Sequence, residues 1–322
     1  MNRVRVLRAD DVRRAIDMRG CIEACEEAFV AYTSGRAELP GVIHLAVPEA
    51  RGEIHVKAGH LHGAPYYAVK AASGFYGGEP PAIDGLVIVF DARDGSPAAF
   101  VLDGGFLTDL RTGAAGGVAA RHLAPERIDR VAVIGTGAQA RFQVDALTEV
   151  RPGFGEVRVW GRNPAHARRA IDDLRERIGD RCVVEGLPSA RDAVDGADVV
   201  ITCTAAREPL VEATWLAPGA HVTAVGSDGA GKQELDPEIL RRADVLVVDS
   251  LDQCSRLGEL QHAPEQGARA VELGTICRGE APGRTGEGQL TVCDLTGIGA
   301  QDVAAANAVM LGAGDRGDTI DL

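Results

Sequence analysis

The stretch Arg130–Ala140, RVAVIGTGAQA, decides the fold of this chain. The run VAVI is typical of a buried strand, and the residues after it place Gly135, Gly137 and Ala140 in the pattern G-x-G-x-x-[GA]. The first glycine permits a tight turn, the second lets the backbone approach a pyrophosphate, and the small third residue lets the helix pack closely. Because a strand precedes the motif and a helix follows it, the motif predicts a dinucleotide-binding site rather than a purely structural turn.

The segments on both sides of this motif predict a parallel α/β domain. EVRVWGRN reads as a second strand, and the later runs ADVVITCTA, HVTAVGSD, ADVLVVDS and QLTVCDLTG read as further strands between helices. This alternation is typical of a doubly wound, Rossmann-type sheet. We predict that cofactor contacts come from the following residues of this part of the chain: Thr112, Gly135, Thr136, Gly137, Ala138, Gln139, Arg162, Asn163, Thr202, Thr204 and Ser227.

The end of the second strand bears on the choice of cofactor. NAD-binding domains usually have Asp or Glu there to accept a hydrogen bond from the ribose 2′-hydroxyl. This chain has Arg162 and Asn163 instead. An arginine suits a 2′-phosphate, so the sequence favours NADP(H) over NAD(H), unless Arg162 is an ordinary surface residue.

The N-terminal part follows different patterns. Residues 10 to 35 are predicted to form a helix that Asp10 or Asp11 caps and Gly35 ends. Between residues 40 and 102, short alternating runs such as EIHVKAG and YYAVKAAS are separated by turn residues. They predict an antiparallel sheet or a barrel-like layer.

Two further helices set the expected domain boundaries. LTDLRTGAAGGVAARHLA predicts a helix capped by Thr108 or Asp109, and AQDVAAANAVM predicts a C-terminal helix that returns to the first domain. We therefore expect an α+β domain for dimerisation and substrate binding from residues 1–115 with 298–322. Residues 116–297 would form the dinucleotide-binding domain.

Composition excludes several classes of protein. The net charge of −13 argues against a nucleic-acid partner, because phosphate binding requires basic patches. The N-terminus is charged and has no apolar core of a signal peptide, and no apolar run is long enough to span a membrane. The seven cysteines form no C-x-x-C pair, so we expect no metal site and a reducing, cytoplasmic environment.

Lysine is scarce in this chain. Only Lys57, Lys70 and Lys232 occur among 34 basic residues. A lysine amine, unlike a guanidinium, can have its pKa lowered enough to transfer protons. We therefore expect a functional role for at least one of the three, although chance retention of a few lysines would give the same count.

The stretch GSDGAGKQE places Gly226, Gly231 and Lys232 at the spacing of a phosphate-binding P-loop. That loop needs a hydroxyl after the lysine to bind Mg²⁺, and this chain has Gln233 there. The stretch is therefore not expected to belong to a nucleotide hydrolase.

Taken together, DLRTGAA, VAVIGTGAQA, VWGRNP, VGSDGAGKQEL and TVCDLTG occur in an order and at spacings that resemble the ornithine cyclodeaminase/μ-crystallin family over essentially the whole chain. RLGELQHA and APGRTGEGQLTVCDLTGIGAQD look like the dehydrogenase subgroup found with ectoine breakdown. The resemblance implies a homodimer built through the N-terminal strands and C-terminal helix. It also implies a substrate pocket bounded by both domains, and chemistry at a C–N bond next to a carboxylate.

The resemblance also implies roles for three residues. Lys70 in YAVKAAS matches the family's active-site lysine, Arg111 in DLRTGAA its carboxylate-binding arginine, and Asp228 in GSDGAGK its catalytic aspartate. A guanidinium binds a carboxylate bidentately, and a carboxylate with an amine can transfer protons at nitrogen. The structural alternatives are a helix N-cap for Asp228, a phosphate contact or interface ion pair for Arg111, and a snorkelling strand residue for Lys70.

The chain departs from the family pattern at two places. His44 lies near the position where many members have a second carboxylate-binding arginine, and His55 aligns with a glutamate of the cyclodeaminases. The second departure favours a dehydrogenase or reductase over a cyclodeaminase. We include His44, His55 and the nearby Lys57 among the expected substrate-binding residues.

The function expected from the sequence is an NAD(P)-dependent oxidoreductase that acts on the C–N bond of a small amino or imino acid, as an amino-acid dehydrogenase or a ketimine reductase. The first alternative is an ornithine cyclodeaminase-type lyase that keeps NAD bound. The second is a non-enzymatic, NADPH-dependent binder of small molecules like μ-crystallin.

Overall fold

The computed structural model describes residues 3–75, 77–78 and 82–321. These residues divide into two compact units. Unit 1 comprises Met1–Arg111 with Ile298–Leu322, and unit 2 comprises Thr112–Gly297. The division falls four residues before the boundary expected from the sequence.

Unit 1 contains an eight-stranded, mainly antiparallel sheet with the order β18-β1-β7-β6-β5-β4-β2, in which β3 also pairs with β4. The long central strands β4, β5 and β6 have ten residues each. The expectation of an antiparallel layer between residues 40 and 102 is therefore correct. The strands are β1 (Arg3–Arg8), β2 (Ala37–Glu38), β3 (Val42–Val47), β4 (Gly52–Leu61), β5 (Tyr66–Phe75), β6 (Ala82–Asp91), β7 (Pro97–Leu102) and β18 (Asp318–Asp321).

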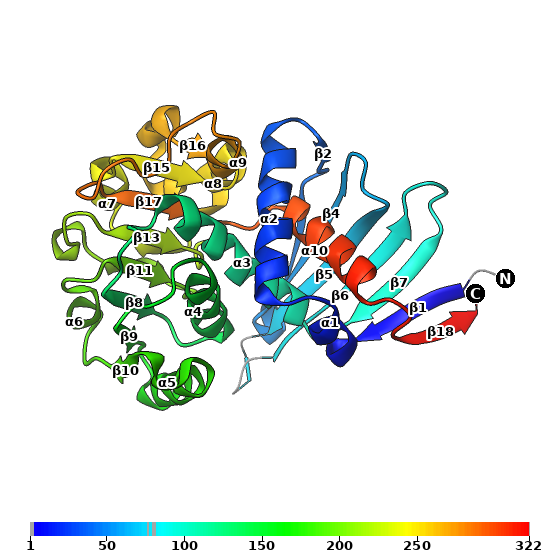
Figure 1. The fold of residues 1–322 in the computed structure, drawn as a ribbon, viewed down its shortest axis with the longest axis horizontal. Helices are drawn as coiled ribbons and strands as arrows, with labels where there is room; N and C mark the ends of the chain where they lie inside the picture. Colours follow the sequence, from blue (N-terminus) through cyan, green and yellow to red (C-terminus); the bar gives the residue numbers. More distant parts are fainter. Residues whose placement is uncertain (1–2, 76, 79–81, 322) are drawn as a thin grey trace. The chain divides into compact units, whose positions relative to one another are not determined.

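The helices α1 (Ala9–Ala15), α2 (Met18–Thr33) and α10 (Gly299–Gly312) pack in unit 1 (Figure 1). α10 packs on α2, β4 and β5, and β18 pairs with β1. The C-terminal segment therefore belongs to unit 1.

The single helix expected over residues 10 to 35 is wrong. The chain becomes extended at Ile16 and Asp17, and the Asp17 carboxylate accepts a hydrogen bond from the backbone N–H of Gly20. This N-cap starts a second helix, because Asp favours the extended cap conformation.

The two faces of the unit 1 sheet differ sharply. On one face, Lys57, Lys70, Val87 and Val101 are buried. On the other, apolar side chains of the edge and central strands remain open, and Ile43 and Leu45 are 65% and 56% exposed. The strand register fixes this division, since residues paired across strands point to the same face.

Unit 2 contains an eight-stranded parallel sheet with the order β10-β9-β8-β11-β13-β17-β15-β16. In this sheet, β9 and β10 lie on one side of β8. The strands that come later in the chain, from β11 onward, lie on its other side, as in a Rossmann fold. Its strands are β8 (Arg130–Ile134), β9 (Glu156–Trp160), β10 (Val183–Gly186), β11 (Val199–Thr202), β13 (His221–Ala224), β15 (Val245–Val248), β16 (Val271–Glu272) and β17 (Thr291–Asp294). A separate parallel pair consists of β12 (Arg207–Val211) and β14 (Gln233–Leu235).

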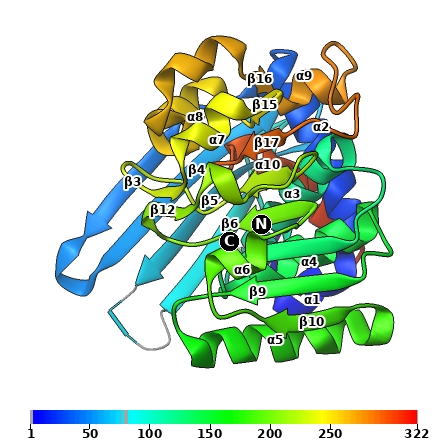
Figure 2. The ribbon, with the colours of Figure 1, turned by 90° about the vertical axis from the view of Figure 1, so that its left-hand side faces the viewer.

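Helices cover both faces of this sheet (Figure 2). In β8, Val131 and Val133 belong to one apolar core, and Ala132 and Ile134 belong to the other. Such alternation shows that the sheet is buried on both sides, as expected for a doubly wound fold. The helices are α4 (Ala138–Val150), α5 (Pro164–Ile178), α6 (Ala190–Val194), α7 (Pro237–Arg242), α8 (Leu251–Leu257) and α9 (Leu273–Cys277).

The helix α3 (Phe106–Leu123) begins before the predicted caps Thr108 and Asp109. Asp103 instead accepts hydrogen bonds from the backbone N–H groups of Gly105 and Leu107 at its start. Among the helices of the described residues, none is long and apolar enough to cross a bilayer.

Candidate functional site

The turn after β8 has the features that a dinucleotide pyrophosphate requires. Gly135 has φ +136°, and a Cβ there would lie 2.7 Å from the carbonyl oxygen of Cys203. Gly137 is the N-cap of α4, and a Cβ there would meet no atom of the described residues within 4 Å. The first residues of α4 therefore offer backbone N–H groups to an anion across open space, so the turn fits the predicted cofactor.

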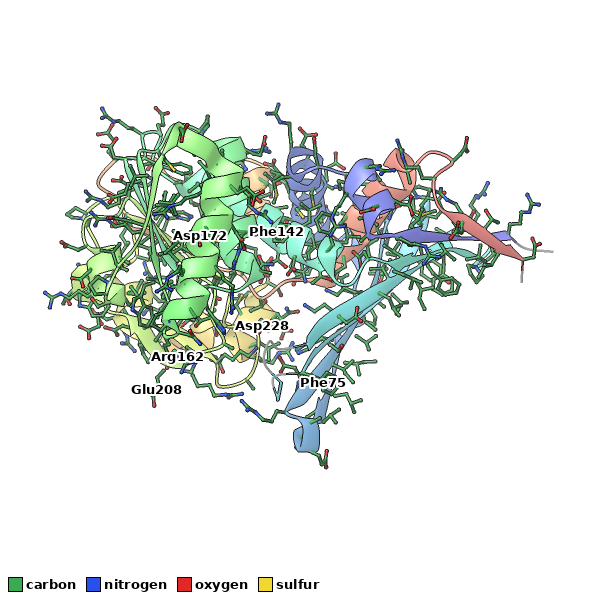
Figure 3. The ribbon with its side chains drawn as sticks, turned by 90° about the horizontal axis from the view of Figure 1, so that it is seen from below. Phe75, Phe142, Arg162, Asp172, Glu208 and Asp228 are labelled. Carbon is green, nitrogen blue, oxygen red and sulfur yellow. The ribbon has the colours of Figure 1, made fainter. Side chains whose placement is uncertain are left out.

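The turn after β9 holds Arg162 and Asn163. Arg162 is exposed, and Asn163 caps α5 by accepting hydrogen bonds from the backbone N–H groups of Ala165 and His166. Figure 3 labels Arg162 together with Asp228, which follows β13. Because the strands are parallel, both residues lie at the carboxyl edge of the sheet, where open α/β sheets bind ligands.

Several predicted cofactor residues have polar groups that already serve the protein interior. The Thr202 hydroxyl donates to Glu234, and the buried Ser227 hydroxyl donates to the carbonyl oxygen of Lys232. Thr204 contributes its backbone N–H to Glu234, and the Thr112 carbonyl accepts from Gln143. These contacts are structural, and cofactor binding by these four residues stays a prediction.

Asp228 lies in the loop between β13 and β14, and its side chain is 45% exposed. Its carboxylate accepts a hydrogen bond of 2.7 Å from the Lys232 ammonium. The alternative role as a helix cap is wrong, because the next helix, α7, begins at Pro237 and Asp236 caps it. The residues after the loop form the short strand β14 instead.

Three buried acids lie behind this loop, and the sequence did not single them out. Glu234 accepts hydrogen bonds from Thr202, Thr204 and the backbone N–H of Gly226. Burial raises the pKa of Glu234 to about 7, that of Glu259 to about 9 and that of Asp294 to about 7. The Glu259 carboxylate accepts from the backbone N–H groups of Glu234 and Leu235.

In unit 1, Lys70 and Arg111 meet on Asp302 of α10. The Lys70 Nζ and the Arg111 Nε lie 2.8 and 2.9 Å from the same carboxylate oxygen, Oδ1. All three side chains are at most 7% exposed. Burial, followed by the Arg111 charge, lowers the pKa of Lys70 to about 7, which brings its amine into the range of proton transfer.

The pKa of Asp302 shifts in the opposite direction from that of most buried acids. Burial opposes its ionisation, but the charges of Arg111, Lys70 and Lys57 outweigh it and lower the pKa to about 2. Asp302 therefore remains a carboxylate at neutral pH. The sequence signal that could have located it is an acid in the first turn of an otherwise apolar helix.

A polar path continues along the same sheet face from Lys57. The register pairs Lys57 with Lys70, and His44 with His55. Glu53 lies between the two histidines, and each imidazole Nε2 is 3.8 Å from its Oε2. The structure thus brings together three of the predicted substrate residues, but it adds a carboxylate that would repel a second substrate carboxylate.

The ornithine cyclodeaminase/mu-crystallin family model matches residues 3–314 of the chain. The chain belongs to this family. A putative dehydrogenase of Rhizobium meliloti is 39% identical over the full length of both proteins. The resemblance inferred from the sequence motifs is therefore confirmed.

Solved structures of the family share the fold over the whole chain. An archaeal alanine dehydrogenase dimer with bound NAD is 33% identical, with a TM-score of 0.89 and complete coverage of both chains. The Delta(1)-pyrroline-2-carboxylate reductase of Thermococcus litoralis, in complex with NADH and L-proline, is 29% identical, with a TM-score of 0.91 over 99% of this chain and 100% of the other. The predicted Rossmann-type fold is confirmed.

Proposed function

We propose that this family member is an NAD(P)-dependent oxidoreductase acting on the C–N bond of a small amino or imino acid. The observation that carries the proposal is the buried Lys70–Asp302–Arg111 cluster, which combines a carboxylate-binding guanidinium with an amine whose pKa is about 7. The alanine dehydrogenase with bound NAD and the reductase in complex with NADH and L-proline support the same class of chemistry.

Each residue has a defined task in this reaction. The Nε of Arg111 donates to Asp302. The two terminal nitrogens of Arg111 would bind the substrate carboxylate. Lys70 would exchange a proton with the substrate nitrogen, and Asp228 would be the second group for proton transfer. The bound nicotinamide would supply or accept the hydride, and the turn at Gly135 and Gly137 would hold its pyrophosphate.

We further propose that NADP(H) is preferred, because Arg162 offers a guanidinium where NAD-binding domains have an acid. Arg162→Ala should weaken NADP(H) binding and leave NAD(H) binding nearly unchanged in a fluorescence titration. The exposed Arg168→Ala, on the following helix, is the control. A wild-type preference for NAD(H) would contradict this assignment.

We propose a homodimer that uses the open face of the unit 1 sheet. Its exposed Ile43, Leu45 and Leu102 are large apolar side chains, and contiguous exposed apolar surface marks interaction sites. Light scattering should give twice the chain mass, and Leu45→Asp should lower it. A wild-type protein that remains monomeric at all concentrations would contradict this proposal.

The function is tested by following absorbance at 340 nm. Wild-type protein is incubated with each amino acid and NADP⁺ or NAD⁺, and with 2-oxo acids plus amines and the reduced cofactors. Net cofactor turnover is expected, and it should disappear in Lys70→Met but persist in Arg93→Ala, whose guanidinium is 86% exposed. Ammonia release without net turnover would indicate a lyase, and cofactor binding without either reaction would indicate a binding protein.

A further inference from the structure

The two oxygens of the Asp302 carboxylate differ in their hydrogen-bond partners. Lys70 and Arg111 both bind Oδ1, whereas Oδ2 has no hydrogen-bond partner within the described part of the chain. The side chain is only 4% exposed. An ionised buried oxygen without a donor is costly, so the arrangement requires an explanation.

A protonated carboxyl group with an unpartnered oxygen would not require such an explanation. Asp294 in unit 2 also has a buried oxygen, Oδ1, without a partner among the described residues. However, burial raises the pKa of Asp294 to about 7, so this group can carry a proton. The pKa of Asp302 is about 2, because the neighbouring cations outweigh the effect of burial, and its second oxygen needs a donor from elsewhere.

The backbone holds Asp302 firmly in place. It lies in the first turn of α10, where the helix dipole favours a negative charge. The same helix packs on β4 and β5, the strands that carry Lys57 and Lys70. The carboxylate therefore cannot move away to find water without disrupting the packing of unit 1.

The charge around Asp302 indicates what kind of molecule supplies the donor. Three basic side chains, Lys57, Lys70 and Arg111, surround this one carboxylate and influence its ionisation. The cluster therefore favours a ligand with a carboxylate, which Arg111 can bind. The unpartnered oxygen additionally favours a donor on the same ligand, close to that carboxylate.

We propose that Asp302 binds the substrate nitrogen: its Oδ2 accepts a hydrogen bond from an α-ammonium or iminium group while Arg111 binds the neighbouring carboxylate. This inference rests on the proposed function and assigns a residue that the sequence did not reveal. Asp302 stays ionised and serves as a hydrogen-bond acceptor, whereas Lys70 exchanges the proton. The site thereby selects α-amino and α-imino acids over carboxylates that lack a nitrogen donor.

The test compares two ligands that differ only in the nitrogen. The amino acid with the highest turnover in the 340 nm screen is used, or L-alanine if none turns over, together with the same acid without nitrogen, which is propionate for alanine. Calorimetry with cofactor-saturated protein gives both affinities. In Asp302→Asn we expect amino-acid binding to weaken by about 30-fold or more, as when a buried charge pair is truncated, and binding of the nitrogen-free acid to change much less.

Asp103→Asn is the matched control, because Asp103 is a buried acid of the same unit whose carboxylate binds backbone N–H groups. This variant should leave the ratio of the two affinities unchanged. Equal weakening of both ligands in Asp302→Asn would overturn the proposal, since it would show a purely structural role.

If Asp302→Asn does not fold, Asp228→Asn provides the decisive measurement. Its loop position is partly exposed, and the variant should keep the wild-type preference for the amino acid over the nitrogen-free acid. Loss of the preference there would assign nitrogen binding to Asp228 and overturn the proposal. In the wild type, a preference for the amino acid without any cofactor turnover would support nitrogen binding while contradicting the proposed reaction, so the two failures are distinguishable.

Discussion

The two units of this protein bury carboxyl groups to a similar degree, yet they shift the pKa values of these groups in opposite directions. In unit 1, Asp302 contacts Lys70 and Arg111, and its pKa is about 2. In unit 2, Glu234 and Glu259 are bound by hydroxyl and backbone N–H groups, and burial raises their pKa values to about 7 and about 9. Burial alone therefore does not decide the charge of an acid; the presence of cations does.

This difference separates the proposed ligand site in unit 1 from acids that support the fold of unit 2. The unit 1 cluster keeps the Asp302 carboxylate ionised in the interior, which is costly unless a charged ligand uses that charge. The unit 2 acids reach neutrality instead and tie together β14, the turn at Gly226 and the end of β11. They thereby support the loop that carries Asp228 without needing a ligand.

Removing Arg111 should have the largest effect, because it eliminates the main cation beside Asp302. In Arg111→Ala we expect kcat/KM for the acid substrate to fall by an amount equivalent to about 2–5 kcal/mol. The pKa of Asp302 should rise toward the pKa values of the unit 2 acids. Steady-state kinetics across pH measures both effects, with Arg93→Ala as the control. If kcat/KM falls no further in Arg111→Ala than in the control, the unit 1 cluster is not a substrate site and does not differ in this respect from the unit 2 acids.

Asp228 provides a third environment, an exposed carboxylate beside a lysine. Asp228→Asn should fold and bind cofactor but lose about 10²-fold in kcat, the effect typical of losing a general acid or base. Asp236→Asn is the matched control, because Asp236 caps α7. Because Asn caps a helix about as well as Asp, this control should keep both its stability and its kcat. If Asp228→Asn keeps its kcat as Asp236→Asn does, Asp228 is not catalytic.

The unit 2 acids make a prediction about stability and pH. The pKa of Glu234 is about 7 in the folded protein and near its ordinary value of 4.5 in the unfolded chain. Between these values the folded state holds a proton that the unfolded state has released. The resulting stabilisation is complete below pH 4.5 and is lost as the pH rises through about 7.

Glu234→Gln keeps the shape of the side chain and removes this titration. The free energy of unfolding of the wild type should fall by up to about 3 kcal/mol more than that of the variant between pH 4.5 and 8. Thermal or urea unfolding at several pH values measures the difference. Parallel curves for the two proteins would show that Glu234 is not held neutral.

The smallest effect is expected at His44, which is half exposed beside Glu53. His44→Arg places a permanent guanidinium at this position, so the KM for an acid substrate should fall by no more than a few-fold, or about 1 kcal/mol. His62→Arg is the control, because His62 forms a similar exposed pair with Glu38. A KM that His44→Arg leaves unchanged would exclude His44 from substrate binding.

Local patterns made part of this structure predictable. The turn at Gly135 and Gly137 depends on neighbours within a few residues, and so do the alternating strands between residues 40 and 102. The same local reasoning missed the new helix that Asp17 caps, and it placed the start of α3 later than Phe106. A cap is decided by which side chain reaches a free N–H group, and this the local sequence does not show.

The charged clusters were beyond such reasoning. Lys70 and Arg111 follow from the family motifs, but Asp302 is 232 and 191 residues away from them in the chain. Likewise Glu53 meets His44 only through the pairing of β3 with β4. These partners depend on tertiary packing, which a single sequence does not display.

The distribution of unit 1 over both ends of the chain also dictates an order of events during synthesis. Unit 2 is one continuous stretch, Thr112–Gly297, and leaves the ribosome complete before α10 has been translated. Lys70 and Arg111 are made early, but the carboxylate that neutralises them arrives only with Asp302. Because domains generally fold as units during translation, nascent unit 1 must wait for α10, and its buried cations remain without that counter-ion until Asp302 emerges.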